Sequence, residues 1–146
     1  MFADIEIPSE HIIYETEYSF VFVNLRPFLP NHILVSPKRI VSRVYELKND
    51  EAIDLFLCVK LATKALKHIY QGFTINIQDG SVAGQKVFHT HVHIVPRNEN
   101  DLCENDQIYK SGALDVERTD RSFEEMRIEA ISLKRYFNAA DNNLED

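Results

Sequence analysis

"HTHVHIVPR", residues 89 to 97, has a histidine at every second position and ends in proline and arginine. Side chains on a β-strand alternate between its two faces, so the three histidines are expected on one face. Thr90, Val92 and Ile94 would share the other face. The apolar face predicts burial in the core, and the imidazole row predicts a cleft. Because alternate residues stand ~7 Å apart along a strand, His91 would have an imidazole on either side.

The segments around this stretch predict a sheet. Alternating β-branched and aromatic residues favour strands at 11–15, 19–23 and 32–36. Pro27 and Pro30 predict a loop between the last two of them. "FTINI" at 73–77 predicts a further strand, which the glycine-containing loop "QDGSVAGQ" at 78–85 connects to the histidine strand.

Helical spacing appears twice. From Asn49 or Asp50 a helix of about five turns is expected to run to a stop at Gly72. One face of this helix is predicted to carry Ile53, Phe56, Val59 or Lys60, Thr63, Leu66 and Ile69. Ser122 and Glu125 form a capping-box pattern ahead of a second helix. These elements predict a single α+β domain over residues 1–146, with a mostly antiparallel sheet and helices on one face.

Two further segments are expected to lack fixed structure. Residues 97–120 are polar and without period, which predicts a mobile loop. Residues 139–146 end in the acidic "DNNLED", which predicts a frayed tail.

Composition limits the possible functions. A chain of 146 residues fits one domain, and its formal charge of -7, without a Lys/Arg-rich run, disfavours nucleic acid or an acidic membrane as partner. No stretch approaches ~20 consecutive apolar residues, and the start lacks a signal-peptide layout, so we expect an intracellular protein. Cys58 and Cys103 form no disulfide or metal-ligand pattern. An anionic ligand would therefore need a locally focused site.

The histidine row has three interpretations. It could decorate a solvated face, although three of the six histidines of the chain lie within five residues. It could bind zinc, because two histidines at i and i+2 can converge on one ion, but no Asp, Glu or Cys lies near the row in sequence. It could attack phosphorus. Neutral imidazole is a suitable nucleophile, and the phosphoramidate that it forms is readily hydrolysed.

The loop before the row favours the third interpretation. Gly80 and Gly84 allow backbone N–H groups to approach an anion, and Gln85 offers a neutral donor. A phosphate held in this turn would lie against the imidazoles. Two-step nucleotidyl transfer is the chemistry that this arrangement predicts.

"HTHVHIVPR" resembles the motif of the histidine triad family, with Thr90 in place of the first apolar residue. The chain is most similar to the Fhit-like branch, and the resemblance extends from about Phe2 through Tyr109 and weakly through the last helix. Supporting stretches are 23–39, 78–85 and "NDQIY" at 105–109. The resemblance implies the fold of that family.

The resemblance also implies roles for residues. His91 would be the nucleophile that carries AMP, and His89 and His93 would support it, with His93 directed at the α-phosphate. Residues implied to bind substrate are Asn24, Gln78, Gly84, Gln85, Lys86, Val87 and His93. His32 would stand behind the triad. Phe2, Phe22 and Leu34 are candidates for an adenine pocket, with core packing as the alternative.

The implied function is hydrolysis of diadenosine triphosphate to AMP and ADP. Two alternatives stay open: a nucleotide-sensing binding module, and a nucleoside phosphoramidase of the same superfamily. The resemblance further implies a homodimer. From the residues we also expect no tightly bound cofactor or metal, a divalent cation that accompanies the substrate, and a cytoplasmic location with the nucleus as a second one. Lys86 departs from the branch, which usually has a small hydroxyl residue at this position.

Overall fold

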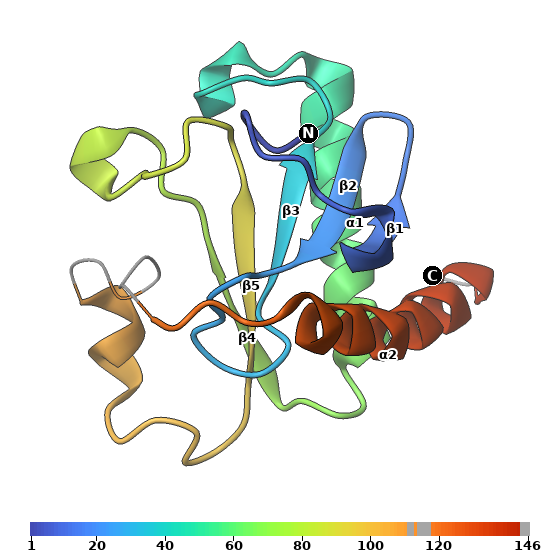
Figure 1. Ribbon diagram of the computed structural model, residues 1–146, viewed down its shortest axis with the longest axis vertical. Coiled ribbons are helices and arrows are strands. Elements are labelled where there is room, and N and C mark those ends of the chain that lie inside the picture. Colours follow the sequence, from blue (N-terminus) through green and yellow to red (C-terminus); the bar gives the residue numbers. More distant parts are fainter. Residues whose placement is uncertain (111–112, 114–117, 144–146) are drawn as a thin grey trace.

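The computed structural model describes residues 1–110, 113 and 118–143. Its single sheet has five strands in the order β1-β2-β3-β5-β4, and every neighbouring pair is antiparallel (Figure 1). The strands are β1 (Ile12–Glu15), β2 (Ser19–Val23), β3 (Ile33–Pro37), β4 (Gly72–Asn76) and β5 (Val92–Arg97). The predicted antiparallel sheet is therefore confirmed.

Two long helices, α1 (Asn49–Leu66) and α2 (Phe123–Asn142), pack on one face of this sheet. Figure 1 shows α1 behind β2 and β3. The main core joins α1 and α2 to side chains of β2, β3 and β5 that point toward the helices, such as Val21, Val35 and Ile94. The α+β class is confirmed. No helix among residues 1–110 and 118–143 is long and apolar enough to cross a membrane.

The predicted face of α1 is buried only in part, because Val59 and Leu66 lie in the core and other members of that face do not. Ile53 and Phe56 are 62% and 69% exposed, whereas the buried positions include Leu55, Cys58 and Ala62. The helix has apolar residues on two sides, and its core side combines Leu55 and Leu66 with the smaller Ala62. Periodicity alone does not show which side faces the sheet.

The histidine segment is only partly a strand, contrary to the prediction. β5 begins at Val92, so His93 lies in the strand while His89 and His91 precede it. The backbone N–H of Thr90 donates to the carbonyl of Val41, which lies outside the sheet. Thr90, Val92 and Ile94 are nevertheless buried as predicted.

Among the described residues, one short 3-10 helix, Ser9–His11, precedes β1, and three more lie in connections: Val44–Glu46, Ser81–Ala83 and Asn105–Tyr109. The last lies within the segment predicted to be a mobile loop, and Ile108 is buried there against Val95 of β5. Residues 111–112 and 114–117 of this segment lie outside the described residues. Helix α2 continues to Asn142, so the first part of the predicted tail is helical, and 144–146 lie outside the described residues.

Candidate active site

His93 lies on the face of the sheet that the helices leave open. In the strand register it is opposite Leu34 of β3 on one side and opposite Asn76 of β4 on the other. Because alternate side chains of a strand share a face, the burial of Val92 and Ile94 in the core turns His93 toward the open face. The sheet thus fixes the position of this imidazole.

A chain of hydrogen bonds determines which ring nitrogen of His93 carries the proton. The backbone N–H of Phe28 donates to Nδ1 of His32 at 2.9 Å, so the proton of neutral His32 is on Nε2. That N–H donates to Nδ1 of His93 at 3.0 Å. The amide nitrogen of Asn24, 3.3 Å from the same Nε2, is a donor only and cannot be its acceptor. The proton of His93 is therefore on Nε2, a buried nitrogen with no hydrogen-bond partner among the described residues.

Backbone contact also fixes the tautomer of His91. Nδ1 of His91 lies 2.7 Å from the carbonyl oxygen of His89, and only an N–H can donate to a carbonyl. When this ring is neutral, its lone pair is consequently on Nε2. The rings of His91 and His93 meet edge to face, with centroids 4.9 Å apart.

His89 is held by the backbone at both ring nitrogens. Its Nδ1 accepts from the N–H of Ala3 at 2.8 Å, and its Nε2–H donates to the carbonyl of Pro37 at 2.7 Å. The ring is fully buried and stacks on Phe2. Both polar atoms of the ring are used, so His89 can position the segment and the carbonyl that holds His91, but its ring is not placed to bind phosphate.

Burial keeps the imidazoles of His32, His89 and His93 neutral. It lowers the pKa of His93 to about 2, with further lowering from the charged forms of His91 and His32. Burial likewise lowers the pKa of His32 to about 3, helped by the positive charges of Arg118 and Arg121. The pKa of His89 is also lowered, again chiefly by burial. Neutral rings have one donor and one acceptor nitrogen, as the tautomer assignments require.

A cavity of about 450 Å³ opens beside His91 and His93. Its size suits one nucleotide-sized ligand. Of the residues predicted from the sequence, the cavity is lined by Phe2, Phe22, Asn24, Leu34, Lys86, Val87, His91 and His93. The predicted adenine pocket and the triad therefore share one space, and His32 and His89 lie buried behind it.

The glycine loop is built around two glutamines. Gly84 has φ of +92°, a backbone conformation that favours glycine, and a Cβ at this position would lie 2.8 Å from the side-chain nitrogen of Gln78, which would have to move. Gln85 is buried: its oxygen accepts from the N–H of Gly80, and its nitrogen donates to the carbonyls of Ser42 and Val87. The expected phosphate donor thus has its amide hydrogens committed to holding the loop.

The cavity beside His91 and His93, here called the histidine cavity, is not lined by Gln78, Gly84 or Gln85. These three residues line a neighbouring cavity. The histidine cavity also contains residues that the sequence did not indicate. These are Ile5, Ile7, Val23, Leu25, Arg26 and Met126. Met126 comes from α2, so no local pattern could have placed it there. Arg26 forms an ion pair with Asp120.

Within the part of the chain that the structure describes, no three His, Cys, Asp or Glu side chains are grouped so that they could hold a metal ion. The nitrogens of His32 and His89 are engaged in hydrogen bonds. The site is therefore organised by hydrogen bonds between imidazoles and the backbone.

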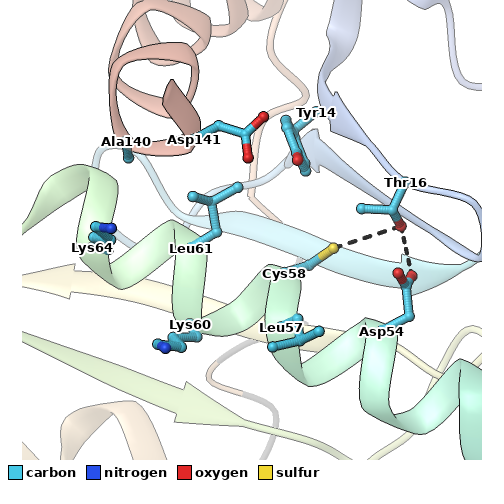
Figure 2. Close-up of a pocket in the computed structure, with 10 residues that line it drawn as sticks. All are labelled: Tyr14, Thr16, Asp54, Leu57, Cys58, Lys60, Leu61, Lys64, Ala140 and Asp141. Carbon is cyan, nitrogen blue, oxygen red and sulfur yellow. Dashed lines mark hydrogen bonds between the residues drawn. The ribbon is translucent and has the colours of Figure 1, made fainter. Parts of the chain in front are cut away.

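A separate cavity of about 330 Å³ lies between α1, α2 and β1 (Figure 2). Here Thr16 donates to a carboxylate oxygen of Asp54 at 2.6 Å, and its hydroxyl lies 3.8 Å from Sγ of Cys58. Burial raises the pKa of the Cys58 thiol to about 11, so this cysteine is not a nucleophile at neutral pH. The cavity contains none of the predicted site residues.

The chain belongs to the HIT domain family, whose model matches residues 5–100. It is 44% identical to the bis(5'-adenosyl)-triphosphatase of Dictyostelium discoideum over 138 residues, which cover 93% of this chain and 91% of that protein. It is 45% identical over 134 residues to the nitrilase and fragile histidine triad fusion protein NitFhit of Caenorhabditis elegans, covering 89% of this chain and 30% of the fusion.

A solved structure agrees with these relatives. The diadenosine triphosphate hydrolase of Plasmodium falciparum, crystallised with Cyclomarin A, superposes with a TM-score of 0.76 at 34% identity, covering 95% of this chain and 84% of that one. The resemblance stated from the histidine motif and its supporting stretches is thereby confirmed, as is the HIT-like fold.

Proposed function

We propose that this chain is a hydrolase that cleaves diadenosine triphosphate to AMP and ADP. The observation that carries the proposal is the pair of tautomers: His91 has its lone pair on Nε2 and His93 has its proton on Nε2, and both residues line one cavity. A nucleophile therefore stands beside a neutral donor. Two relatives that each match 93% of this chain support the same substrate: one, 44% identical, is named bis(5'-adenosyl)-triphosphatase, and the other, 39% identical, is named bifunctional bis(5'-adenosyl)-triphosphatase/adenylylsulfatase.

The proposed reaction has two steps. Nε2 of His91 attacks the α-phosphorus, an N–P bond forms, and the P–O bond to ADP breaks with its electron pair on the leaving oxygen. Water then attacks the same phosphorus, the N–P bond breaks with its electron pair returning to Nε2 of His91, and AMP leaves with the water oxygen while a proton of the water is released to solvent. Nε2–H of His93 donates to a phosphate oxygen throughout and so stabilises charge that develops in the transition state.

His91→Ala tests the covalent mechanism. Turnover should fall by roughly 10³-fold or more, while AMP binding changes little, because other groups of the cavity bind the nucleotide. Mass spectrometry of wild-type protein quenched during turnover should find AMP attached to His91. A His91→Ala protein that keeps a tenth of the wild-type rate would refute the mechanism.

Measurement of turnover also distinguishes the proposed hydrolase from the two alternatives, a nucleotide-sensing module and a nucleoside phosphoramidase. A nucleotide-sensing module should bind diadenosine triphosphate tightly and show a negligible rate. A nucleoside phosphoramidase should prefer adenosine 5'-phosphoramidate to the dinucleotide. A panel of di- and mononucleotide substrates with product analysis distinguishes all three.

The proposal includes a homodimer without a resident metal. Apolar side chains are exposed on α1, including Ile53 and Phe56, and on the sheet edge, where Ile75 of β4 and the adjoining Ile77 are 45% and 43% exposed. Pairing of two copies through α1 and β4 would cover both surfaces.

A divalent cation would accompany the substrate phosphates, so chelation should affect the substrate and not the fold. Fluorescent tagging tests the proposed cytoplasmic and nuclear location.

A further inference from the structure

A tight turn at residues 2–5 lies against the histidine segment. The backbone N–H of Phe2 donates to the carbonyl of Ile5 at 2.8 Å, and the N–H of Ile5 donates to the carbonyl of Phe2 at 2.9 Å. These two hydrogen bonds close the turn. The N–H of Ala3, inside the turn, donates to Nδ1 of His89 at 2.8 Å, across 86 positions of the sequence.

The backbone of Ala3 is strained. Its φ is +52°, in the left-handed region that residues other than glycine rarely adopt. Strain of this kind persists only where surrounding contacts hold it, and it is concentrated at functional sites. The contacts here are with the triad, because the ring of Phe2 stacks on His89 with centroids 5.3 Å apart and meets His91 edge to face at 5.1 Å.

The hydrogen bond from Ala3 reaches the nucleophile through His89. Because Nδ1 of His89 accepts this bond, the ring proton is on Nε2, which donates to the carbonyl of Pro37. The main-chain carbonyl of His89 in turn accepts from Nδ1–H of His91 at 2.7 Å. A shift of the His89 ring would therefore move the carbonyl that sets the tautomer of His91.

The same turn forms part of the wall of the histidine cavity. Phe2 and Ile5 both line this cavity, and Phe2 packs against Phe22 and Leu34. Ala3 does not line it, so the contribution of Ala3 to the site comes from its backbone.

We propose that the turn at residues 2–5 is a positioning element of the active site. The N–H of Ala3 fixes the tautomer of His89 and, through the carbonyl of His89, the orientation of His91. The effect of the turn on the rate rests on the proposed function. Its effect on the ring of His89 requires no substrate and can be measured in the free protein.

The test replaces Ala3 by lactic acid through nonsense suppression, which exchanges the backbone N–H for an ester oxygen and keeps the methyl side chain. Loss of a donor to a buried acceptor should lower kcat for diadenosine triphosphate about tenfold. KM should change by less than about twofold, because the side chains that line the cavity are unchanged. Nitrogen NMR should show that the proton of His89 is no longer confined to Nε2.

The same exchange at Ala52 is the matched control. The N–H of Ala52 donates to the carbonyl of Lys48 at the start of α1, so this ester also removes one backbone hydrogen bond. Neither kcat nor the tautomer of His89 should change.

Two encoded variants give an independent comparison. Ala3→Gly keeps the N–H and relieves the strain, so kcat should stay at the wild-type value. Ala3→Pro has no N–H and cannot reach a positive φ, so kcat should fall at least as far as in the ester protein. If Ala3→Pro does not fold, the ester protein decides.

The outcomes separate the two proposals. If the wild-type protein fails to cleave diadenosine triphosphate, the proposed function is wrong, while a changed His89 tautomer in the ester protein would still support the role of Ala3 at that ring. If the wild-type protein is active and the ester protein keeps its kcat and its His89 tautomer, the turn is only a wall of the cavity. A changed tautomer with an unchanged kcat would overturn the link from His89 to His91.

Discussion

Nε2 of His32 lies 3.0 Å from Nδ1 of His93, and this hydrogen bond joins residues 61 positions apart in the sequence. Since His32 is itself oriented by the N–H of Phe28, the proton that His93 presents to the cavity depends on two residues, His32 and Phe28, that do not line that cavity. His32 is thus a positioning residue. Its effect should appear in the chemistry of His93.

Replacing His32 by leucine removes the donor to His93. Nδ1 of His93 then has no fixed partner, the Nε2–H tautomer is no longer enforced, and we expect kcat to fall by roughly tenfold or more with a smaller change in KM. Nitrogen NMR of the His93 ring should show a mixture of tautomers. His11→Leu is the matched control, because His11 is a buried histidine whose ring nitrogen contacts the carbonyl of Phe123 on α2. A normal kcat with an unchanged His93 tautomer would contradict the positioning role.

The buried histidines make folding stability depend on pH. The folded-state pKa values of His32 and His93, about 3 and about 2, lie below the ordinary value of 6.5, so the unfolded chain binds protons first on acidification. The contribution of the two neutral rings to the free energy of unfolding is fully present above about pH 6.5. It is lost as the pH falls, by about 1.4 kcal/mol per pH unit for each residue. Denaturant unfolding at pH 7.5, 6.5 and 5 should reveal a loss of a few kcal/mol.

His32→Leu provides the comparison for this pH effect. The variant lacks one of the two groups, so its stability should fall less steeply between pH 6.5 and pH 5 than that of the wild type. Proton NMR should find that neither His32 nor His93 titrates in this range. Titration of both rings near pH 6.5 would show that burial does not hold them neutral.

Exposed apolar residues on α1 predict a dimer. Light scattering of the wild-type protein should give about twice the chain mass of 17.0 kDa. Phe56→Glu places a charge on the exposed side of α1 and should give the monomer mass. Ile128→Glu, at a 57% exposed position on α2, should remain dimeric. A wild-type mass of 17 kDa at micromolar concentration would exclude the dimer.

The sequence predicted those parts of the fold that depend on local periodicity. Strand alternation and the Ser122 capping box were sufficient for the sheet and the start of α2. The buried side of α1 was not predictable, because apolar residues lie on two sides of that helix and only packing against the sheet distinguishes them. The start of β5 was misplaced because the alternation of histidines continues beyond the hydrogen-bonded strand.

The candidate site likewise has residues that the sequence predicted and residues that only the structure could place. His91 and His93 were recognisable from their spacing, and the structure places both at one cavity. The neighbouring cavity joins the glycine loop to Tyr109, which lies more than twenty residues further along the chain, and no sequence pattern links them. Gln85 was expected to bind phosphate because its amide is a donor; only the structure shows that the amide holds the loop.

Lys86 should select for a charged leaving group. Arg26, the other basic residue at the histidine cavity, is paired with Asp120, whereas Lys86 is exposed where the two cavities meet. Its ammonium should favour ADP over an amine as leaving group, so that Lys86→Thr lowers the preference for diadenosine triphosphate over adenosine 5'-phosphoramidate by about fivefold, the effect of ~1 kcal/mol at a solvated site. Because salt screens exposed charges, the difference should shrink at high ionic strength. Lys67→Thr, at an exposed position just after α1, controls for the loss of one positive charge. An unchanged ratio of kcat/KM values would remove Lys86 from substrate selection, and a wild-type preference for the phosphoramidate would overturn the substrate assignment itself.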